Sequence, residues 1–139
     1  MPARHVLDWR LLAVIAAGSA LGGVLRYLVG FAFVQRFGPA FPWGTLTVNL
    51  TGCFLIGIAI ELSQTRLFGG WAYWRPFAAT GVLGGYTTFS TFAFETLTFI
   101  GDRSLVLAFG YACTSLVLGV AAAYAGTLFS RILWLTLPG

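Results

Sequence analysis

The sequence predicts an all-α integral membrane protein with four transmembrane helices, and three observations carry this prediction. First, 58% of the 139 residues are hydrophobic and only 9% are charged. Soluble domains usually have about 25% charged residues. Second, a domain this small has too much surface for its volume to hide so much apolar area from water. Third, the apolar residues gather into four stretches of about 20 residues or more, which is the length that a helix needs to cross a bilayer.

Local signals place the ends of the four helices. The expected helices span about residues 9–34, 43–62, 76–100 and 104–129. Gly38 and Pro39 end the first, which is too long for the apolar region of a signal peptide. Pro76 suits the first turn of the third, and Asp102 or Ser104 caps the fourth. The connecting loops are too short for another domain, so residues 1–139 form one membrane domain.

The basic residues are all arginines, and they mostly flank the apolar stretches. This placement argues for headgroup anchoring and against nucleic-acid binding. Four spans put both termini on one side, with five arginines there (Arg4, Arg10, Arg66, Arg75 and Arg131) and two opposite (Arg36 and Arg103). The bias favours a cytoplasmic N-terminus but is small enough to allow insertion in both orientations. The aromatic residues Trp71, Tyr73 and Trp74 are typical of an interfacial belt.

Three polar residues inside the apolar stretches are candidates for function. Asn49 lies one turn from Thr45 on the same face of the second helix, either as a hydrogen-bonding contact between helices or as a donor to a solute. Arg26 in the first helix either extends to the membrane interface or attracts anions to a vestibule. Glu95 is an acid inside an apolar stretch. It either has a functional role there or is a buried partner of Arg26.

The third stretch contains the richest polar segment. Adjacent glycines and a threonine weaken a helix near the bilayer centre, so we expect the third helix to be broken near the midplane. Broken backbone there must be buried or line a cavity. Phe89 and Phe92, three residues apart, project from one face and offer the positive edges of their rings to an anion, or they only pack. We include the hydroxyls of Thr88 and Ser90 in the candidate ion pathway.

The fourth stretch carries Tyr111 and Ser115 on one face, followed by Gly119. Tyr111 and Ser115 either form a row of polar groups along the helix, which we call the polar track, or Ser115 forms a hydrogen bond to a backbone carbonyl of its own helix. Catalytic and metal-binding constellations are absent from the sequence, so we expect no enzyme activity. Cys53 and Cys113 show no metal spacing, and we expect both to be small apolar core residues.

Three motifs together resemble the bacterial fluoride ion channel family (Fluc, also called CrcB). They occupy residues 22–27 (GGVLRY), 44–52 (GTLTVNLTG) and 84–92 (GGYTTFSTF). The resemblance implies a passive fluoride-selective channel in the bacterial inner membrane that exports cytoplasmic fluoride and protects against its toxicity. It also implies a homodimer of two oppositely inserted copies with two pores.

The resemblance also implies roles for individual residues. Phe89 and Phe92 would present ring edges to fluoride, and Asn49 would donate to it. Tyr111 and Ser115 would form the polar track, with Thr45, Thr88 and Ser90 beside the pathway. Arg26 and Glu95 would shape the vestibules, and the backbone carbonyls of Gly84 and Thr87 would hold a structural Na⁺ at the dimer centre. Gly119 stands where the family often has a third hydroxyl.

Two other functions are compatible with four short spans. A small dual-topology multidrug exporter would need a membrane-embedded acid in the first span, and this span has Arg26 and no acid. A non-transporting membrane subunit would explain small-residue faces such as Gly18 with Gly22 and Ala122 with Gly126. It would not explain hydroxyls clustered at the membrane centre.

Overall fold

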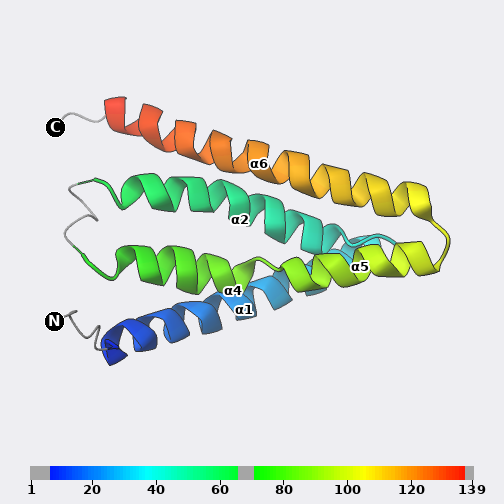
Figure 1. Ribbon diagram of the computed structural model, residues 1–139, viewed down its shortest axis with the longest axis horizontal. Coiled ribbons are helices and arrows are strands. Elements are labelled where there is room, and N and C mark those ends of the chain that lie inside the picture. Colours follow the sequence, from blue (N-terminus) through cyan, green and yellow to red (C-terminus); the bar gives the residue numbers. More distant parts are fainter. Residues whose placement is uncertain (1–6, 66–70, 137–139) are drawn as a thin grey trace, which may run out of the picture.

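The fold is a bundle of long helices that lie side by side in the computed structural model (Figure 1). The structure describes residues 7–65 and 71–136, and within these ranges it contains no strand. The elements are α1 (Trp9–Phe37), α2 (Trp43–Leu62), η1 (Pro76–Leu83), α4 (Gly84–Tyr86), α5 (Phe89–Gly101) and α6 (Leu105–Thr136). Successive passes alternate in direction along the bundle, so α2 and α6 run parallel to each other.

Three helices are long and apolar enough to cross a membrane: Trp9–Phe37, Trp43–Leu62 and Leu105–Trp134. Most of their apolar side chains lie on the outside of the bundle, which is the arrangement that lipid rather than water stabilises. The chain is therefore a multi-pass membrane protein. Between α2 and α6, the elements η1, α4 and α5 follow one another as a broken helical segment (Figure 1).

The expected helix ends agree closely with the structure in α2 and differ in α1 and α6. Helix α1 continues to Phe37 and ends at Gly38, whose φ of 74° lies in the left-handed region that glycine tolerates. Helix α6 continues to Thr136 rather than stopping near residue 129. Arg131 does not end it, because arginine is a good helix former and its side chain pairs with Glu61 of α2.

The broken segment contains helical turns that are wider than those of an α-helix. Its first eight residues, Pro76–Leu83, form a π-helix, which the sequence pattern did not predict. Wide π turns inside a helical segment often occur at functional sites. Here they lie where the backbone of Gly81 approaches that of Gly18 in α1.

Glycines allow the helices to approach one another at backbone distance. A Cβ at Gly18 would lie 2.8 Å from the carbonyl oxygen of Phe77, and one at Gly22 would overlap the carbonyl of Val82. Likewise, a Cβ at Gly126 in α6 would overlap the carbonyl of Phe54 in α2. Close packing of this kind holds helices together in lipid, where no hydrophobic force acts between them.

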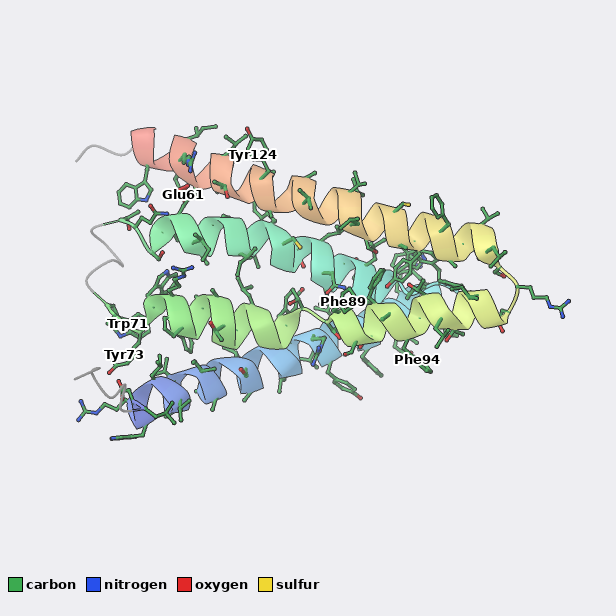
Figure 2. The ribbon with its side chains drawn as sticks, viewed as in Figure 1. Glu61, Trp71, Tyr73, Phe89, Phe94 and Tyr124 are labelled. Atoms are coloured by element: carbon green, nitrogen blue, oxygen red, sulfur yellow. The ribbon has the colours of Figure 1, made fainter. Side chains whose placement is uncertain are left out.

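One end of the bundle is fixed by an aspartate outside the apolar stretches. Asp8 caps α1 by accepting from the backbone N–H of Arg10 at 2.9 Å, and it also accepts from the hydroxyl of Tyr73 at 3.0 Å. The bond from the Arg10 N–H lowers the pKa of Asp8 below its ordinary value, and the bond to Asp8 raises the pKa of Tyr73. Figure 2 shows Glu61, Trp71 and Tyr73 at this end.

Apart from Arg26, which lies within α1, the arginines of the described residues lie at the two ends of the bundle. Arg10, Arg75 and Arg131 lie at the end where α1 begins, and Arg36 and Arg103 lie at the other end. Arg4 and Arg66 fall outside the described residues. Of the cysteines, Cys53 is half-buried, whereas Cys113 is exposed, so the expectation of a core position was wrong for Cys113. It lies on α6, whose outer face is apolar and faces the lipid.

A pair of adjacent glycines tests the packing of α1. A Cβ at Gly22 would overlap the carbonyl of Val82 and lie 2.8 Å from the backbone nitrogen of Tyr86, whereas one at Gly23 would have nothing within 4 Å. We expect Gly22→Ala to lower the free energy of unfolding by about 1–3 kcal/mol, as overpacking does. Thermal unfolding in detergent measures this change. Gly23→Ala is the matched control, and equal stability of the two variants would contradict this packing.

Candidate functional site

The centre of the candidate site is the break between α4 and α5. Thr87 has φ −78° and ψ 158°, and Thr88 has φ −149° and ψ 116°. Both conformations are extended rather than helical. The break therefore falls two residues after the paired glycines Gly84 and Gly85, which are themselves helical together with Tyr86, and it lies in the segment where the sequence predicts a broken helix. At membrane depth, the polar groups that it frees must find partners in the protein.

The side chain of Asn49 supplies partners for Thr88. The backbone N–H of Thr88 donates to Oδ1 of Asn49 at 2.8 Å, and Nδ2 of Asn49 donates to the carbonyl of Thr88 at 3.1 Å. One side-chain amide thus replaces two backbone partners. Asn49 is the contact between helices that one of the two interpretations expected, and one N–H of its Nδ2 is not used by this pair.

Arg26 supplies a partner for Thr87. Its Nη1 donates to the carbonyl of Thr87 at 3.2 Å, while the backbone N–H of Thr87 donates to the carbonyl of Leu83 at 2.9 Å. The guanidinium of Arg26 therefore reaches the break, so extension of this side chain to the membrane interface does not describe it fully. Every backbone N–H and carbonyl of the two extended residues is hydrogen-bonded.

The hydroxyl of Thr88 caps α5. Its Oγ1 accepts from the backbone N–H of Thr91 at 3.2 Å, and it lies 3.0 Å from Oγ1 of Thr91 and 3.3 Å from Oγ of Ser90. Thr88 is buried, whereas Ser90 and Thr91 are exposed on this single chain. The positive end of the α5 helix dipole thus lies beside the break, where it favours a negative charge.

Glu95 joins three elements one to two turns beyond the break. Thr45 of α2 donates to its Oε1 at 2.7 Å, and Tyr111 of α6 donates to its Oε2 at 2.7 Å. The interpretation of Glu95 as a partner of Arg26 was wrong, because Arg26 bonds to Thr87 instead. The convergence of Thr45, Glu95 and Tyr111 was not predicted.

An aromatic row connects the break to Tyr111. The ring centroids of Phe89 and Phe92 are 5.6 Å apart, and those of Phe92 and Tyr111 are 5.2 Å apart. Phe89 is 79% exposed on this chain, and Figure 2 shows it at the break. Phe92 packs against its neighbours, but Phe89 has a ring surface that the single chain leaves uncovered.

The polar track on α6 has one buried tyrosine and one unpartnered serine. Tyr111 is only 2% exposed. Oγ of Ser115 is buried and has no hydrogen-bond partner, so it does not bond back to its own helix, which was one of the two interpretations. Thr114 is exposed and lies off this face, whereas Gly119 is buried.

Cavities lie on both sides of Thr88. One of about 320 Å³ is lined by Asn49, Cys53, Gly84, Thr87, Thr88 and Phe89, among others. Another of about 540 Å³ is lined by Arg26, Thr45, Thr88 and Thr91, among others. A third of about 510 Å³ includes Thr45 and Glu95 in its lining. Asn49, Arg26, Thr45 and Glu95 thus each line one or more of these spaces, whereas Ser90, Phe92, Tyr111 and Ser115 line none of the three.

Comparisons with known proteins match most of the chain. A family model described as "CrcB-like protein, Camphor Resistance (CrcB)" matches residues 13–127. A protein of Agrobacterium fabrum named "Fluoride-specific ion channel FluC" is 45% identical over 123 residues, which cover 88% of this chain and 98% of the relative. A protein of the same name from Nitrobacter winogradskyi is 44% identical over 127 residues, which cover 91% of this chain and 100% of the relative.

The hydrogen bonds at the break predict that Asn49 is required for stability. Asn49→Ala leaves the buried N–H and carbonyl of Thr88 without partners. Each unpaired buried group costs about 1–3 kcal/mol, so we expect a clear loss of unfolding free energy in detergent. Thr98→Ala is a matched control, because the hydroxyl of Thr98 bonds only to its own helix at Phe94. A loss no larger than that of the control would contradict the role of Asn49.

Proposed function

The chain belongs to the CrcB-like family, and we propose that it is a fluoride-specific channel through which fluoride crosses the membrane passively. The family consists of ion channels and not of enzymes. The observation that carries the proposal is the break at Thr87–Thr88. There, uncharged donors and aromatic rings meet on one face of the bundle, in a chain 45% identical to a protein named as a fluoride channel.

The proposed ion pathway uses neutral groups rather than fixed charge. Fluoride is small and strongly hydrated, so a selective pore must replace its water with several short hydrogen bonds and still release it. Asn49 offers its remaining N–H, and Ser90 and Ser115 offer hydroxyls. Phe89 and Phe92 offer the positive edges of their rings. Each contact is weak alone, so the ion is held but not trapped.

The charged residues act at the sides of this pathway. The guanidinium of Arg26 lies at the break and raises the local concentration of anions. Glu95 accepts from Thr45 and Tyr111. By accepting both hydroxyl protons it fixes Thr45 and Tyr111 at the end of the aromatic row, so the donors that remain for an anion are those of Asn49, Ser90 and Ser115.

Passive conduction is sufficient for export. A negative-inside membrane potential drives an anion outward by about 2.3 kcal/mol per charge per 100 mV. Fluoride that enters as neutral hydrogen fluoride dissociates inside, so a channel in the bacterial inner membrane would remove it without energy coupling. This direction protects the cell from fluoride.

We propose that two copies pair in opposite orientations and form two pores. The exposed ring of Phe89 and the cavity beside it lie on a face that a second copy would cover. The arginines at the two ends are balanced closely enough to permit both orientations. A cysteine placed at Asp102 in a chain without Cys53 and Cys113 tests this. An impermeant maleimide should label it from both sides of the membrane, and labelling from one side only would contradict dual insertion.

We propose that a structural Na⁺ lies between the two copies. Gly84 and Thr87 both line the cavity on the proposed pairing face, and carbonyl oxygens are suitable ligands for hard cations. The carbonyl of Thr87 has two lone pairs, and Arg26 takes one. The residues present therefore fit the ion, which would join the two copies near the break.

Fluoride efflux from liposomes tests the proposed function. We expect the purified protein to release fluoride and to retain chloride. We expect the double variant of Phe89→Ile and Phe92→Ile to slow fluoride efflux roughly tenfold, because two ring edges worth about 0.5–1.5 kcal/mol each are lost while the side chains still fill space. Phe109→Ile is the control, since Phe109 on α6 is 73% exposed and lines none of the three cavities. Equal chloride and fluoride release would contradict the proposal.

Sodium removal tests the pairing and the ion together. A ligand that binds only the folded pair stabilises it in proportion to the logarithm of its concentration. We expect the protein in sodium chloride to be a two-chain species by light scattering and to melt at a higher temperature than in N-methylglucamine chloride of equal ionic strength. A one-chain mass would contradict the dimer, and equal melting temperatures would contradict the sodium site.

A further inference from the structure

The cavity of about 510 Å³ lies at the end of the bundle where α1 and α5 end and α2 begins. Its volume is in the range of small-molecule sites. More aromatic residues line it than line either of the other two cavities. These residues are Phe33, Phe41, Trp43, Phe94 and Phe99. A molecule in this cavity would therefore meet several ring surfaces.

The rings hold one another in place. The ring centroid of Phe41 lies 4.5 Å from that of Trp43 and 6.1 Å from that of Phe99. Tyr111 meets Phe41 in an edge-to-face arrangement, with an angle of 79° between the two ring planes. Trp43 is nevertheless 46% exposed and Phe94 is 70% exposed. Part of this ring surface is therefore free to contact a ligand.

The lining of the cavity is acidic. Glu95 and Asp102 both line it, and they lie two helical turns apart, on one side of α5. Among the described residues, no arginine or histidine lines this cavity, whereas Arg26 lines the cavity of about 540 Å³. Arg36 and Arg103 lie at this end of the bundle but outside the lining. Two negative helix ends, those of α1 and α5, also meet one positive end, that of α2. The lining therefore favours a cation.

The walls suit an organic cation better than a metal ion. A metal site needs several ligand side chains close together, and the described residues include no group of three or more His, Cys, Asp or Glu that could hold a metal ion. Aromatic ring faces instead attract ammonium ions that carry alkyl groups, because the faces are negative and the alkyl groups pack on them. The combination of rings and carboxylates thus matches an alkylammonium group.

We propose that this cavity binds an organic ammonium ion. Phe41 and Trp43 contact its alkyl groups, and the carboxylates of Glu95 and Asp102 balance its charge. Glu95 can do so while it accepts from Thr45 and Tyr111, since each carboxylate oxygen has a second lone pair. The ammonium group is that of a free ion or of a zwitterionic lipid headgroup, because the cavity lies at an end of the bundle. This ligand is separate from the fluoride of the proposed channel.

Calorimetric titration with tetraethylammonium chloride tests the site in maltoside detergent, which contains no ammonium group. We expect saturable binding to the purified protein in sodium chloride buffer. Trp43→Leu should weaken the affinity about threefold to tenfold, the value of one cation–π contact. Trp71→Leu is the matched control, because Trp71 is also 46% exposed but lies at the opposite end of the bundle. Asp102→Asn should weaken the affinity by a similar factor, because it removes the charge and keeps the size.

The melting temperature shows whether each variant is folded. Absence of saturable binding to the unsubstituted protein would overturn the site, and so would equal affinities of the folded Trp43→Leu and Trp71→Leu proteins. Nanodiscs distinguish the two sources of the ammonium group. Weaker tetraethylammonium binding in phosphatidylcholine than in phosphatidylglycerol supports a lipid headgroup as the natural occupant, and equal binding supports a free ion. Fluoride is absent from these titrations, so a failure of fluoride efflux would overturn the channel function and not this site.

Discussion

The pairing of Asn49 with the backbone of Thr88 is the interaction on which the rest of the structure depends. A helix whose backbone is broken inside a membrane exposes N–H and C=O groups, and lipid cannot form hydrogen bonds with them. The amide of Asn49 satisfies both groups of Thr88, and Arg26 satisfies the carbonyl of Thr87. These two partners come from α2 and α1, so the break exists only when three passes of the chain are packed together. Folding of the bundle and formation of the site are therefore the same event.

The open backbone also sets the electrostatics of the site. The carboxyl end of α4 and the amino end of α5 meet at Thr87 and Thr88, so carbonyl oxygens and amide hydrogens are presented within two residues. A cation and an anion can each find a complementary helix end there. Phe89 begins α5, which places an aromatic ring directly at the positive end. The positive end of α5, the ring of Phe89 and the guanidinium of Arg26, which donates to the carbonyl of Thr87, all favour an anion beside the break.

The sequence predicts those features that depend on short-range chemistry. The glycines before Thr87 locate the break, the turn residues locate α2, and helical spacing puts Thr45 and Asn49 on one face. The meeting of Thr45, Glu95 and Tyr111 depends on how α2, α5 and α6 are aligned, and no local pattern contains that alignment. The π turns of η1 lie where it packs on α1, and the residue pattern does not predict them.

The glycine contacts between α1 and the broken segment have a consequence for motion. Where backbone touches backbone at Gly18 and Gly22, there is no side chain whose rotamer could change and let one helix slide on the other. Sliding of α1 against the broken segment is therefore disfavoured. Rearrangement at the site is left to rotations of rings and hydroxyls, which take picoseconds to nanoseconds, rather than to helix displacements, which take microseconds to milliseconds.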